Sequence, residues 1–282
     1  MGVNNLEAFI VAFVRQEVAW AGTETRYRQP LVGFAAAADP RFPQLRELAE
    51  PTHLLPGDLL PAARSVVSFF LPFAEEVVEA NRVARGQVAR EWALAYVETN
   101  ALINRIAQGL IAALAERGVR AAAEPATHNW DPVTLVSRWS HKSVAAIAGL
   151  GSFGLHHMLI TDAGCAGRFG SVVVEAELPP TAEPGVAARV RCRYLHDGSC
   201  MTCVQRCPVG ALTKDGLDKR RCYRWLLRVA ENFGDLGLAD VCGKCATGPC
   251  ATECGVRNAD CGMGNPHSAP KSWEEICWLR TA

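Results

Sequence analysis

The sequence lacks an uninterrupted apolar run of about 18 residues or more, the length that a membrane-spanning helix needs. Residues 1–17 lack the basic start and the small-residue cleavage site of a secretory signal, and no twin-arginine motif occurs there. We therefore expect a cytoplasmic protein with no membrane partner.

The chain also lacks a net charge, since 29 Lys and Arg balance 29 Asp and Glu among its 282 residues. No broad electrostatic attraction to nucleic acid is expected from such a chain. The local exception is a group of four arginines, Arg220, Arg221, Arg224 and Arg228. Apolar residues make up 49% of the sequence, which is enough for a sizeable core.

Cysteine is absent before Cys165, and ten of the twelve cysteines fall between Cys192 and Cys261, counting both ends. A secreted disulfide scaffold usually spreads its cysteines through a short chain. Clustering in one segment of a long chain indicates metal binding instead. Cys165 stands alone and is interpreted as an ordinary small residue, and Cys261 and Cys277 are not expected to be ligands.

The pattern of apolar residues predicts a mixed α+β fold ahead of the cysteine-rich segment. Helices are expected over residues 1–16, 88–117 and 140–150, and strands over 65–73, 119–123, 157–161 and 171–178. Residues 179–185 are the best linker candidate, because prolines and a glycine interrupt any regular element there. One further helix is expected over 218–232. The predicted domains are therefore 1–180 and 186–282.

Two cysteine groups carry the metal chemistry. They read Cys192-x7-Cys200-x2-Cys203-x3-Cys207-Pro208 and Cys242-x2-Cys245-x4-Cys250-x3-Cys254, with Cys222 between them. A 4Fe–4S cluster needs four converging thiolates, and in the bacterial C-x2-C-x2-C-x3-C-P pattern the cysteine before proline ligates the other cluster. The first place of that pattern falls on Asp197, so Cys192 is the expected substitute. Zinc is the alternative for paired C-x2-C motifs, but the x3-C-P ending and the number of cysteines favour two 4Fe–4S clusters.

Several stretches resemble the epoxyqueuosine reductase family. They are the C-P motif, Lys219-Arg220-Arg221-Cys222-Tyr223, the closing C-x2-C group, and Ala148-Gly149-Leu150-Gly151-Ser152-Phe153-Gly154, which is similar to the family's A-G-L-G-W-x-G. Leu54-Leu55-Pro56-Gly57 and the neighbourhoods of Leu159-Ile160 and Gly170-Ser171 extend the resemblance over about residues 51–254. The order of these stretches relative to the cysteines makes the resemblance fairly specific.

The resemblance implies a nitroreductase-like, cobalamin-binding domain joined to a ferredoxin-like module with two 4Fe–4S clusters, an architecture that reductive dehalogenases share. It implies that Cys192, Cys200, Cys203 and Cys250 hold one cluster, with Cys254 in reserve for Cys250, and that Cys207, Cys222, Cys242 and Cys245 hold the other. The cofactor-binding residues that it suggests are Gly149, Gly151, Phe153, Gly154, His156, Arg168 and Ser171.

The residues themselves leave other interpretations of this cofactor set open. The three glycines fit a helix C-cap and tight turn as well as the approach of a flat cofactor. Their G-x-G-x-x-G spacing follows a predicted helix rather than a strand, which argues against a dinucleotide site. One of His156 and His157 could approach cobalt or form ordinary hydrogen bonds, and Arg168 could bind a corrinoid carboxamide or phosphate or make a salt bridge.

The family's catalytic Asp aligns near Glu124, and Asp131 in the following loop is a second candidate for the proton donor. The alternative interpretation of each residue is a solvated carboxylate in a loop. The family's Y-A-x-G-R-D-Y-H stretch is replaced by residues 90–96, and the chain ends soon after the cysteines. Together with the neutral charge, these departures argue against tRNA as the substrate and favour a paralogue of the queuosine enzyme.

Three functional hypotheses follow. The first is a cobalamin-dependent reductase of a small or nucleoside-like substrate, which receives electrons from a low-potential donor such as flavodoxin or ferredoxin. The second is an electron-transfer protein without a corrinoid, and the third is a protein that reduces cobalamin for delivery or reactivation. Corrinoid stoichiometry separates the second hypothesis from the other two.

Overall fold

A four-stranded antiparallel sheet forms the centre of the computed structural model, which describes residues 3–127 and 129–254. Its strands lie in the order β1 (Leu31–Ala36), β2 (Ser65–Pro72), β6 (Gly167–Val174) and β3 (Ala121–Ala122). The strand expected over 65–73 is confirmed as β2. The strand expected over 171–178 begins and ends four residues earlier, as β6, and β1 has no counterpart among the expected strands.

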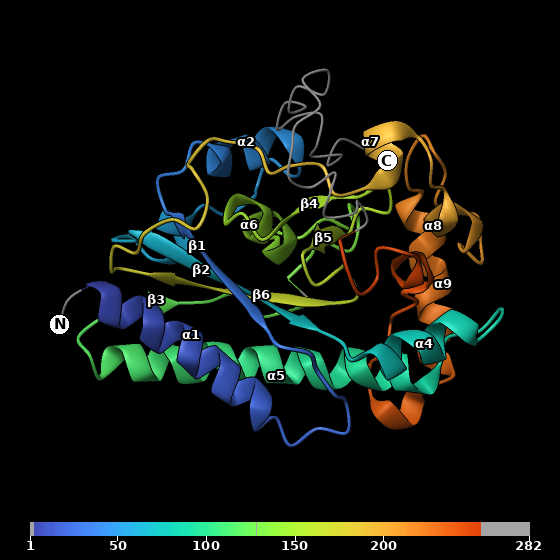
Figure 1. Cartoon of the computed structure of the whole chain (residues 1–282), viewed down its shortest axis with the longest axis horizontal. Coiled ribbons are helices and arrows are strands. Elements are labelled where there is room, and N and C mark those ends of the chain that lie inside the picture. Colours follow the sequence, from blue (N-terminus) through green and yellow to red (C-terminus); the bar gives the residue numbers. More distant parts are fainter. Residues whose placement is uncertain (1–2, 128, 255–282) are drawn as a thin grey trace.

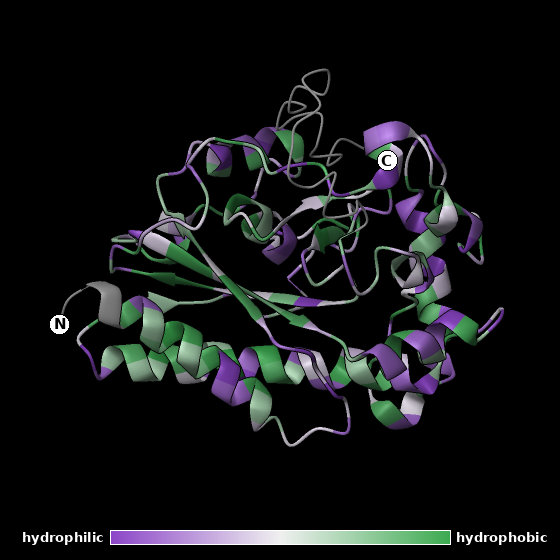
Figure 2. Ribbon diagram, viewed as in Figure 1, coloured by the Kyte–Doolittle hydropathy of each residue, from purple (hydrophilic) through white to green (hydrophobic). Residues whose placement is uncertain are grey.

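The sheet is covered on both faces, and β2 alternates between them. Val67 and Phe69 pack with α1 (Val3–Ala19) and α5 (Arg90–Ala115), whereas Val66 and Phe70 pack with α2 (Arg41–Leu48) and α6 (His141–Ile147). This is the two-residue period of a strand buried on both sides. Figure 1 shows the two long helices below the sheet and α2 and α6 above it. Hydrophobic residues concentrate on the sheet and along α5 (Figure 2).

The helices expected over 1–16, 88–117 and 140–150 are confirmed as α1, α5 and α6. The Ser140 hydroxyl accepts a hydrogen bond from the Ser143 amide at the start of α6. Gly149, at a φ of +76°, follows its end. The remaining elements of this part are α3 (Pro56–Leu59), α4 (Glu75–Val83) and a hairpin of β4 (Gly151–Phe153) with β5 (Leu159–Thr161).

The cysteine-rich segment lies against one end of the sheet and its helices (Figure 1). Its elements are α7 (Arg193–Asp197), α8 (Thr202–Gln205), α9 (Lys219–Glu231) and the 3-10 helices η1 (Gly234–Leu236) and η2 (Lys244–Thr247). The helix expected over 218–232 is confirmed as α9. Phe73 and Trp92 share one hydrophobic cluster with Cys203 and Cys242, so this segment has no core separate from α4 and α5.

The stretch expected to be a linker is anchored to the sheet. The Thr181 amide donates to the Phe34 carbonyl at 2.9 Å, and the Phe34 amide donates to the Thr181 hydroxyl at 2.7 Å. Next to it, the buried Arg41 guanidinium pairs with Asp39 and donates to the Val186 carbonyl. The division at 180/186 stays a prediction, since this anchoring says nothing of independent folding.

Arg28 joins three distant segments with one side chain. Its guanidinium donates to the carbonyls of Phe73 at 2.9 Å, Ala163 at 2.7 Å and Thr252 at 2.8 Å. In the part of the chain that the structure describes, no helix is both long and apolar enough to cross a membrane.

Candidate metal centre and adjoining cavity

The first cysteine group gathers around a small cavity between α7, α8 and the segment after η2. Its lining includes Cys192, Cys200, Cys203 and Cys250, with Cys245 contributing from η2. Cys192 stands at the start of α7, and Gly198 at a φ of +78° turns the chain back toward Cys200. The structure therefore brings together the four cysteines that the resemblance assigns to one cluster.

Asp197, at the position where the ferredoxin pattern would place a cysteine, has another role. Its exposed carboxylate accepts a hydrogen bond from the Ser199 amide at 2.8 Å. This contact holds the pKa of Asp197 below its usual value. The aspartate thus stabilises the turn between Cys192 and Cys200.

The second group consists of Cys207, Cys222, Cys242 and Cys245, which all line a larger cavity. Cys222 projects from α9, whose first turn is capped by the Asp218 carboxylate at 2.8 Å from the Arg221 amide. Burial, followed by neighbouring sulfurs, raises the pKa of Cys222 to about 11 and that of Cys203 to about 12. Crowded thiols of this kind become thiolates when a cation compensates their charge, so the donor set fits metal clusters.

The cysteines outside these two groups are placed differently. Cys254 lines neither cavity, and Cys261 and Cys277 lie outside the described residues. Cys165 is fully buried, with its sulfur 3.9 Å from that of Cys250. No local sequence pattern indicates this approach, because the two residues are 85 positions apart.

His156 lies close to both of these sulfurs, with its Nε2 3.6 Å from Cys165 Sγ. Its Nδ1 accepts a hydrogen bond from the Met158 amide at 3.1 Å, so the neutral ring carries its proton on Nε2. Nε2 lies 3.3 Å from Cys250 Sγ. Hydrogen bonds from Cys165 and then from His156 lower the pKa of Cys250. His156 also lines both cavities, so it stands between the first cysteine group and the larger space.

The larger cavity has a volume of about 520 Å³ and opens between the sheet end, the loop around Trp130 and α9. Much of its wall is aromatic, from Trp92, Tyr96, Trp130, Tyr223 and Trp225. Trp130 meets Tyr223 edge-on with ring centroids 5.2 Å apart. A pocket of this size, mostly apolar with a few polar groups, is typical of small-molecule sites.

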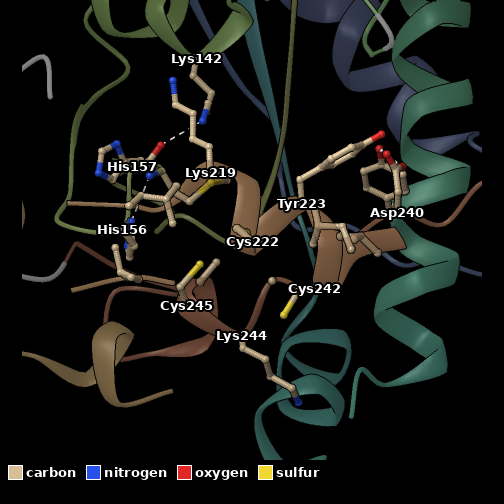
Figure 3. A pocket seen from close by; sticks show the side chains of 18 of the residues that line it. Lys142, His156, His157, Lys219, Cys222, Tyr223, Asp240, Cys242, Lys244 and Cys245 are labelled. Carbon is tan, nitrogen blue, oxygen red and sulfur yellow. Dashed lines mark hydrogen bonds between the residues drawn. The ribbon is translucent and has the colours of Figure 1, made fainter. Parts of the chain in front are cut away.

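Tyr96, Arg168 and Asp240 form a polar group in the lining of this cavity, and Figure 3 shows Asp240 on the side away from Lys142 and Lys219. The Tyr96 hydroxyl donates to Asp240 Oδ1 at 2.8 Å, and the Arg168 guanidinium lies over the Tyr96 ring at 4.4 Å. Burial raises the pKa of Tyr96 and lowers that of Arg168. Asp240 carries the single carboxylate among the residues that line this cavity. It was not predicted from the sequence, although it precedes Cys242 by two residues.

Three residues of the suggested cofactor set, Phe153, His156 and Arg168, line the cavity. Gly149, Gly151, Gly154 and Ser171 are not part of its lining. A Cβ on Gly151 would lie 2.3 Å from the Ile160 carbonyl oxygen, so close packing inside the β4–β5 hairpin accounts for that glycine. Ser171 is buried in a network in which its hydroxyl accepts from the Trp139 indole at 2.9 Å and lies 2.8 Å from His141 Nδ1.

The two suggested proton donors, Glu124 and Asp131, lie outside this cavity lining. The exposed Asp131 accepts hydrogen bonds from the amides of Val133 and Thr134 at 2.8 and 2.7 Å. These contacts hold its pKa below the usual value. Asp131 therefore acts in this structure as a turn-stabilising carboxylate, and the catalytic role of both residues stays a prediction.

Comparison with known proteins identifies the fold to which this chain is similar. No family model matches the chain. An epoxyqueuosine reductase of Burkholderia pseudomallei is 35% identical over 85 residues, which make up 29% of this chain and 21% of that protein. A selenomethionine-labelled epoxyqueuosine reductase has a TM-score of 0.53 at 19% identity over 87% of this chain, and the Bacillus subtilis enzyme has a TM-score of 0.53 at 20% identity over 87%. The chain has the epoxyqueuosine reductase fold.

The chain covers 65% of each of these two epoxyqueuosine reductase structures. Another structure of an epoxyqueuosine reductase, in complex with an epoxyqueuosine-modified tRNA-Tyr stem loop, has a TM-score of 0.50 at 19% identity and is covered over 59% of its length. At these identities the likeness concerns the fold, so cofactors and substrate must be argued from this chain's own residues.

Those residues fit a large cofactor with many acceptor oxygens. The Nε–H of Arg168 is buried, lies in a side chain of the cavity lining and has no acceptor among the described residues. Buried donors of this kind are normally satisfied. A corrinoid carries carboxamide oxygens at its rim, so such a group would supply the missing acceptor at this wall of the cavity.

Proposed function

We propose that this chain is an iron–sulfur oxidoreductase in which two 4Fe–4S clusters relay electrons to a corrinoid for reduction of a small or nucleoside-like substrate. The observation that carries the proposal is the second cysteine group, because its four thiols line the same cavity as Arg168, Tyr96 and Asp240. A cluster held there adjoins the reaction space directly.

In this proposal Cys192, Cys200, Cys203 and Cys250 hold one cluster, and Cys207, Cys222, Cys242 and Cys245 hold the other. The cysteine-rich segment is then a ferredoxin-like module on a nitroreductase-like domain. A bound corrinoid supplies a reducible cobalt. The protein's part is to hold that cofactor with Arg168 and Phe153, to exclude water with the aromatic wall, and to keep a proton on the Tyr96 hydroxyl.

Tyr96 and Asp240 are a better placed proton-holding pair than Glu124 and Asp131. The Tyr96 hydroxyl is buried in the cavity lining and directed at Asp240, and burial keeps it protonated. If the hydroxyl turns from Asp240 to the substrate, its proton can be transferred there, and the Arg168 guanidinium over the ring offsets the negative charge left on the tyrosine oxygen. Conversion of Tyr96 to Phe is expected to abolish turnover while both clusters remain.

The electron donor in this proposal is a cytoplasmic low-potential protein such as flavodoxin or ferredoxin. Arg220, Arg224 and Arg228 recur every four residues on α9 and are exposed, as is Arg221. This basic stripe lies on the face of α9 opposite Cys222, across the helix from the proposed second cluster, which makes it suited to an acidic donor surface.

The deciding experiment is anaerobic reconstitution with iron and sulfide followed by titration with cob(II)alamin, recorded by UV–visible and EPR spectroscopy. We expect about eight irons per chain, as two 4Fe–4S clusters require, and a perturbed cobalt signal at one corrinoid per chain. The same iron content with the spectrum of free cobalamin would contradict the corrinoid and leave an electron-transfer protein. Reduction of bound cobalamin without turnover of any electrophile would indicate a corrinoid-handling protein.

A further inference from the structure

Apart from the four cysteines of the second group, the lining of the large cavity holds more cationic than anionic side chains. The cationic side chains are those of Lys142, Arg168, Lys219 and Lys244, against the single carboxylate of Asp240. Asp240 accepts the hydrogen bond of Tyr96, and Lys244 directs its ammonium group away, to the carbonyls of Asn81 and Ala84. The charges that remain directed toward the cavity are those of Lys142, Lys219 and Arg168.

Lys142 and Lys219 come from opposite walls and meet. Lys142 extends from the first turn of α6 and Lys219 from the first residue of α9, and Figure 3 shows the two side chains alongside one another. The Lys142 ammonium donates to the His157 carbonyl at 3.0 Å. Neither lysine forms an ion pair with any residue in the described ranges 3–127 and 129–254.

This arrangement is unfavourable for the empty protein. Two ammonium groups near each other repel, and both are partly removed from water. Burial lowers the pKa of Lys142 to about 8; the Cys245 sulfur opposes this shift, and Arg168 and Lys219 add to it. Burial also lowers the pKa of Lys219. Lys219 further opposes the dipole at the start of α9, where positive charge is disfavoured. An anion between the two lysines would offset each of these costs.

We propose that Lys142 and Lys219 form an anion-binding subsite, so that the substrate of this cavity is a flat apolar molecule bearing a carboxylate or phosphate group. The aromatic wall of Trp130, Tyr223 and Trp225 takes the apolar body. The lysine pair takes the charged group, which orients the molecule relative to Tyr96. This inference rests on the proposed function, because it names the substrate class of the same cavity.

The probes for the test are benzoate, phenyl phosphate and the neutral isostere benzamide. Binding to the anaerobically reconstituted chain is measured by calorimetry and by quenching of tryptophan fluorescence. We expect at least one of the two anions to bind at least tenfold more tightly than benzamide. Lys142→Gln and Lys219→Gln should each weaken anion binding at least fivefold and leave benzamide binding unchanged, which also shows that the variants fold. Lys142→Arg should retain most of the affinity.

Lys214→Gln is the matched control, because Lys214 is an exposed lysine outside the cavity lining. Equal binding of anions and benzamide would overturn the proposal. So would a shift of a cluster's reduction potential in the two variants without loss of anion binding, which would assign the lysines to the charge of the second cluster. Cluster content is measured on the same samples, so a failure of the proposed function is seen separately as missing clusters.

The phosphate of a corrinoid's nucleotide loop is a second source of the same anion. The titration is therefore repeated after addition of cobalamin and after addition of cobinamide, which lacks that phosphate. Benzoate binding that survives both corrinoids supports a substrate anion. Loss of benzoate binding after addition of cobalamin, but not after addition of cobinamide, would overturn the substrate assignment and show that the lysines bind the phosphate of the cofactor.

Discussion

His156 shows how a single side chain decides the surroundings of a sulfur that is proposed as a cluster ligand. Because the Met158 amide occupies Nδ1, the proton on Nε2 is directed at Cys250 Sγ, 3.3 Å away. Hydrogen bonds to cluster sulfurs stabilise the reduced, more negative state and raise the reduction potential. The residue that the resemblance assigned to the cofactor is thus better placed to adjust the first cluster.

His156→Leu removes that donor and keeps a buried apolar side chain in its place. We expect the midpoint potential of one cluster to fall and that of the other to stay the same, as followed by EPR-monitored redox titration. His156→Gln, whose amide can still donate, should restore part of the difference. Two unchanged potentials would mean that Cys250 is not a ligand and would favour Cys254.

His141 makes stability depend on pH. It is buried between Ser171 and the Pro125 carbonyl, and burial lowers its pKa from 6.5 to about 4. Between about pH 4 and pH 6.5 the unfolded chain binds a proton at this histidine that the folded chain does not bind. The contribution of the neutral, buried His141 to the free energy of unfolding is therefore fully present above about pH 6.5. It is lost at about 1.4 kcal/mol per pH unit as the pH falls toward 4.

Thermal unfolding of the wild type should therefore shift downward between about pH 7.5 and pH 5.5, with a smaller shift for His141→Gln. The variant should be less stable than the wild type at the higher pH, since two buried hydrogen bonds change. His196→Gln, on the exposed surface of α7, is the control and should follow the wild type. Parallel curves for His141→Gln and the wild type would contradict the argument.

Much of the convergence of the cysteines could be predicted at this scale, because cysteine spacing constrains which thiols can converge. Eight cysteines assigned from the resemblance do gather in two groups of four. Glu124 and Asp131 could not be judged in the same way, because a loop carboxylate has the same sequence context whether it caps a turn or lines a cavity. Asp240, Tyr96, Lys142 and Lys219 meet only through the tertiary fold, which no local pattern encodes.

At the scale of elements, Gly243 fixes how the turn before η2 approaches α5. It has a φ of +65°, and a Cβ there would lie 2.1 Å from the Trp92 ring. Both features disfavour any side chain at position 243, directly after Cys242. The position of the second cysteine group therefore requires glycine at position 243, where the turn packs against Trp92.

Gly243→Ala is expected to cost about 1–3 kcal/mol through its backbone conformation alone, and the ring of Trp92 must move as well. We expect the purified variant to hold about half the iron of the wild type, measured by iron analysis and EPR. Gly248→Ala is the control, since its Cβ would meet Thr202 at an ordinary 3.5 Å. Full iron content in Gly243→Ala would show that the turn tolerates the change.

Elements whose pattern is local were predictable, and those made by distant pairing were less so. α5 and α9 carry long periodic or well-capped stretches and match their expected ranges closely. β1 contains Gly33 and ends in two alanines, so its strand propensity is weak. It is a strand because β2 pairs with it, and Gly33 allows the close approach of Leu150, whose Cδ2 would lie 2.8 Å from a Cβ.

At the scale of the whole molecule, the cysteine-rich segment and the α/β part share one hydrophobic cluster. Phe73, Val78, Trp92 and Ile160 are all nearly fully buried within it, together with cysteines of both groups. Burying four side chains of this size contributes roughly 6–12 kcal/mol. That is comparable to the total stability of a typical domain, about 5–15 kcal/mol.

A fragment of residues 1–180 is therefore not expected to keep the native fold, because its end surface would be left apolar. We expect this fragment to bind a hydrophobic dye and to unfold without a sharp thermal transition, whereas the full chain unfolds cooperatively. Circular dichroism and dye fluorescence give the comparison. A sharp transition in the fragment would instead confirm the two-domain division drawn from the sequence.

The hydrogen bonds of Arg28 can all be formed only late in the synthesis of the chain. Its Thr252 partner leaves the ribosome 224 residues later, after the strands, α5 and all eight proposed ligand cysteines. The Arg28 guanidinium can therefore bind the Thr252 carbonyl only after all eight proposed ligand cysteines have been synthesised.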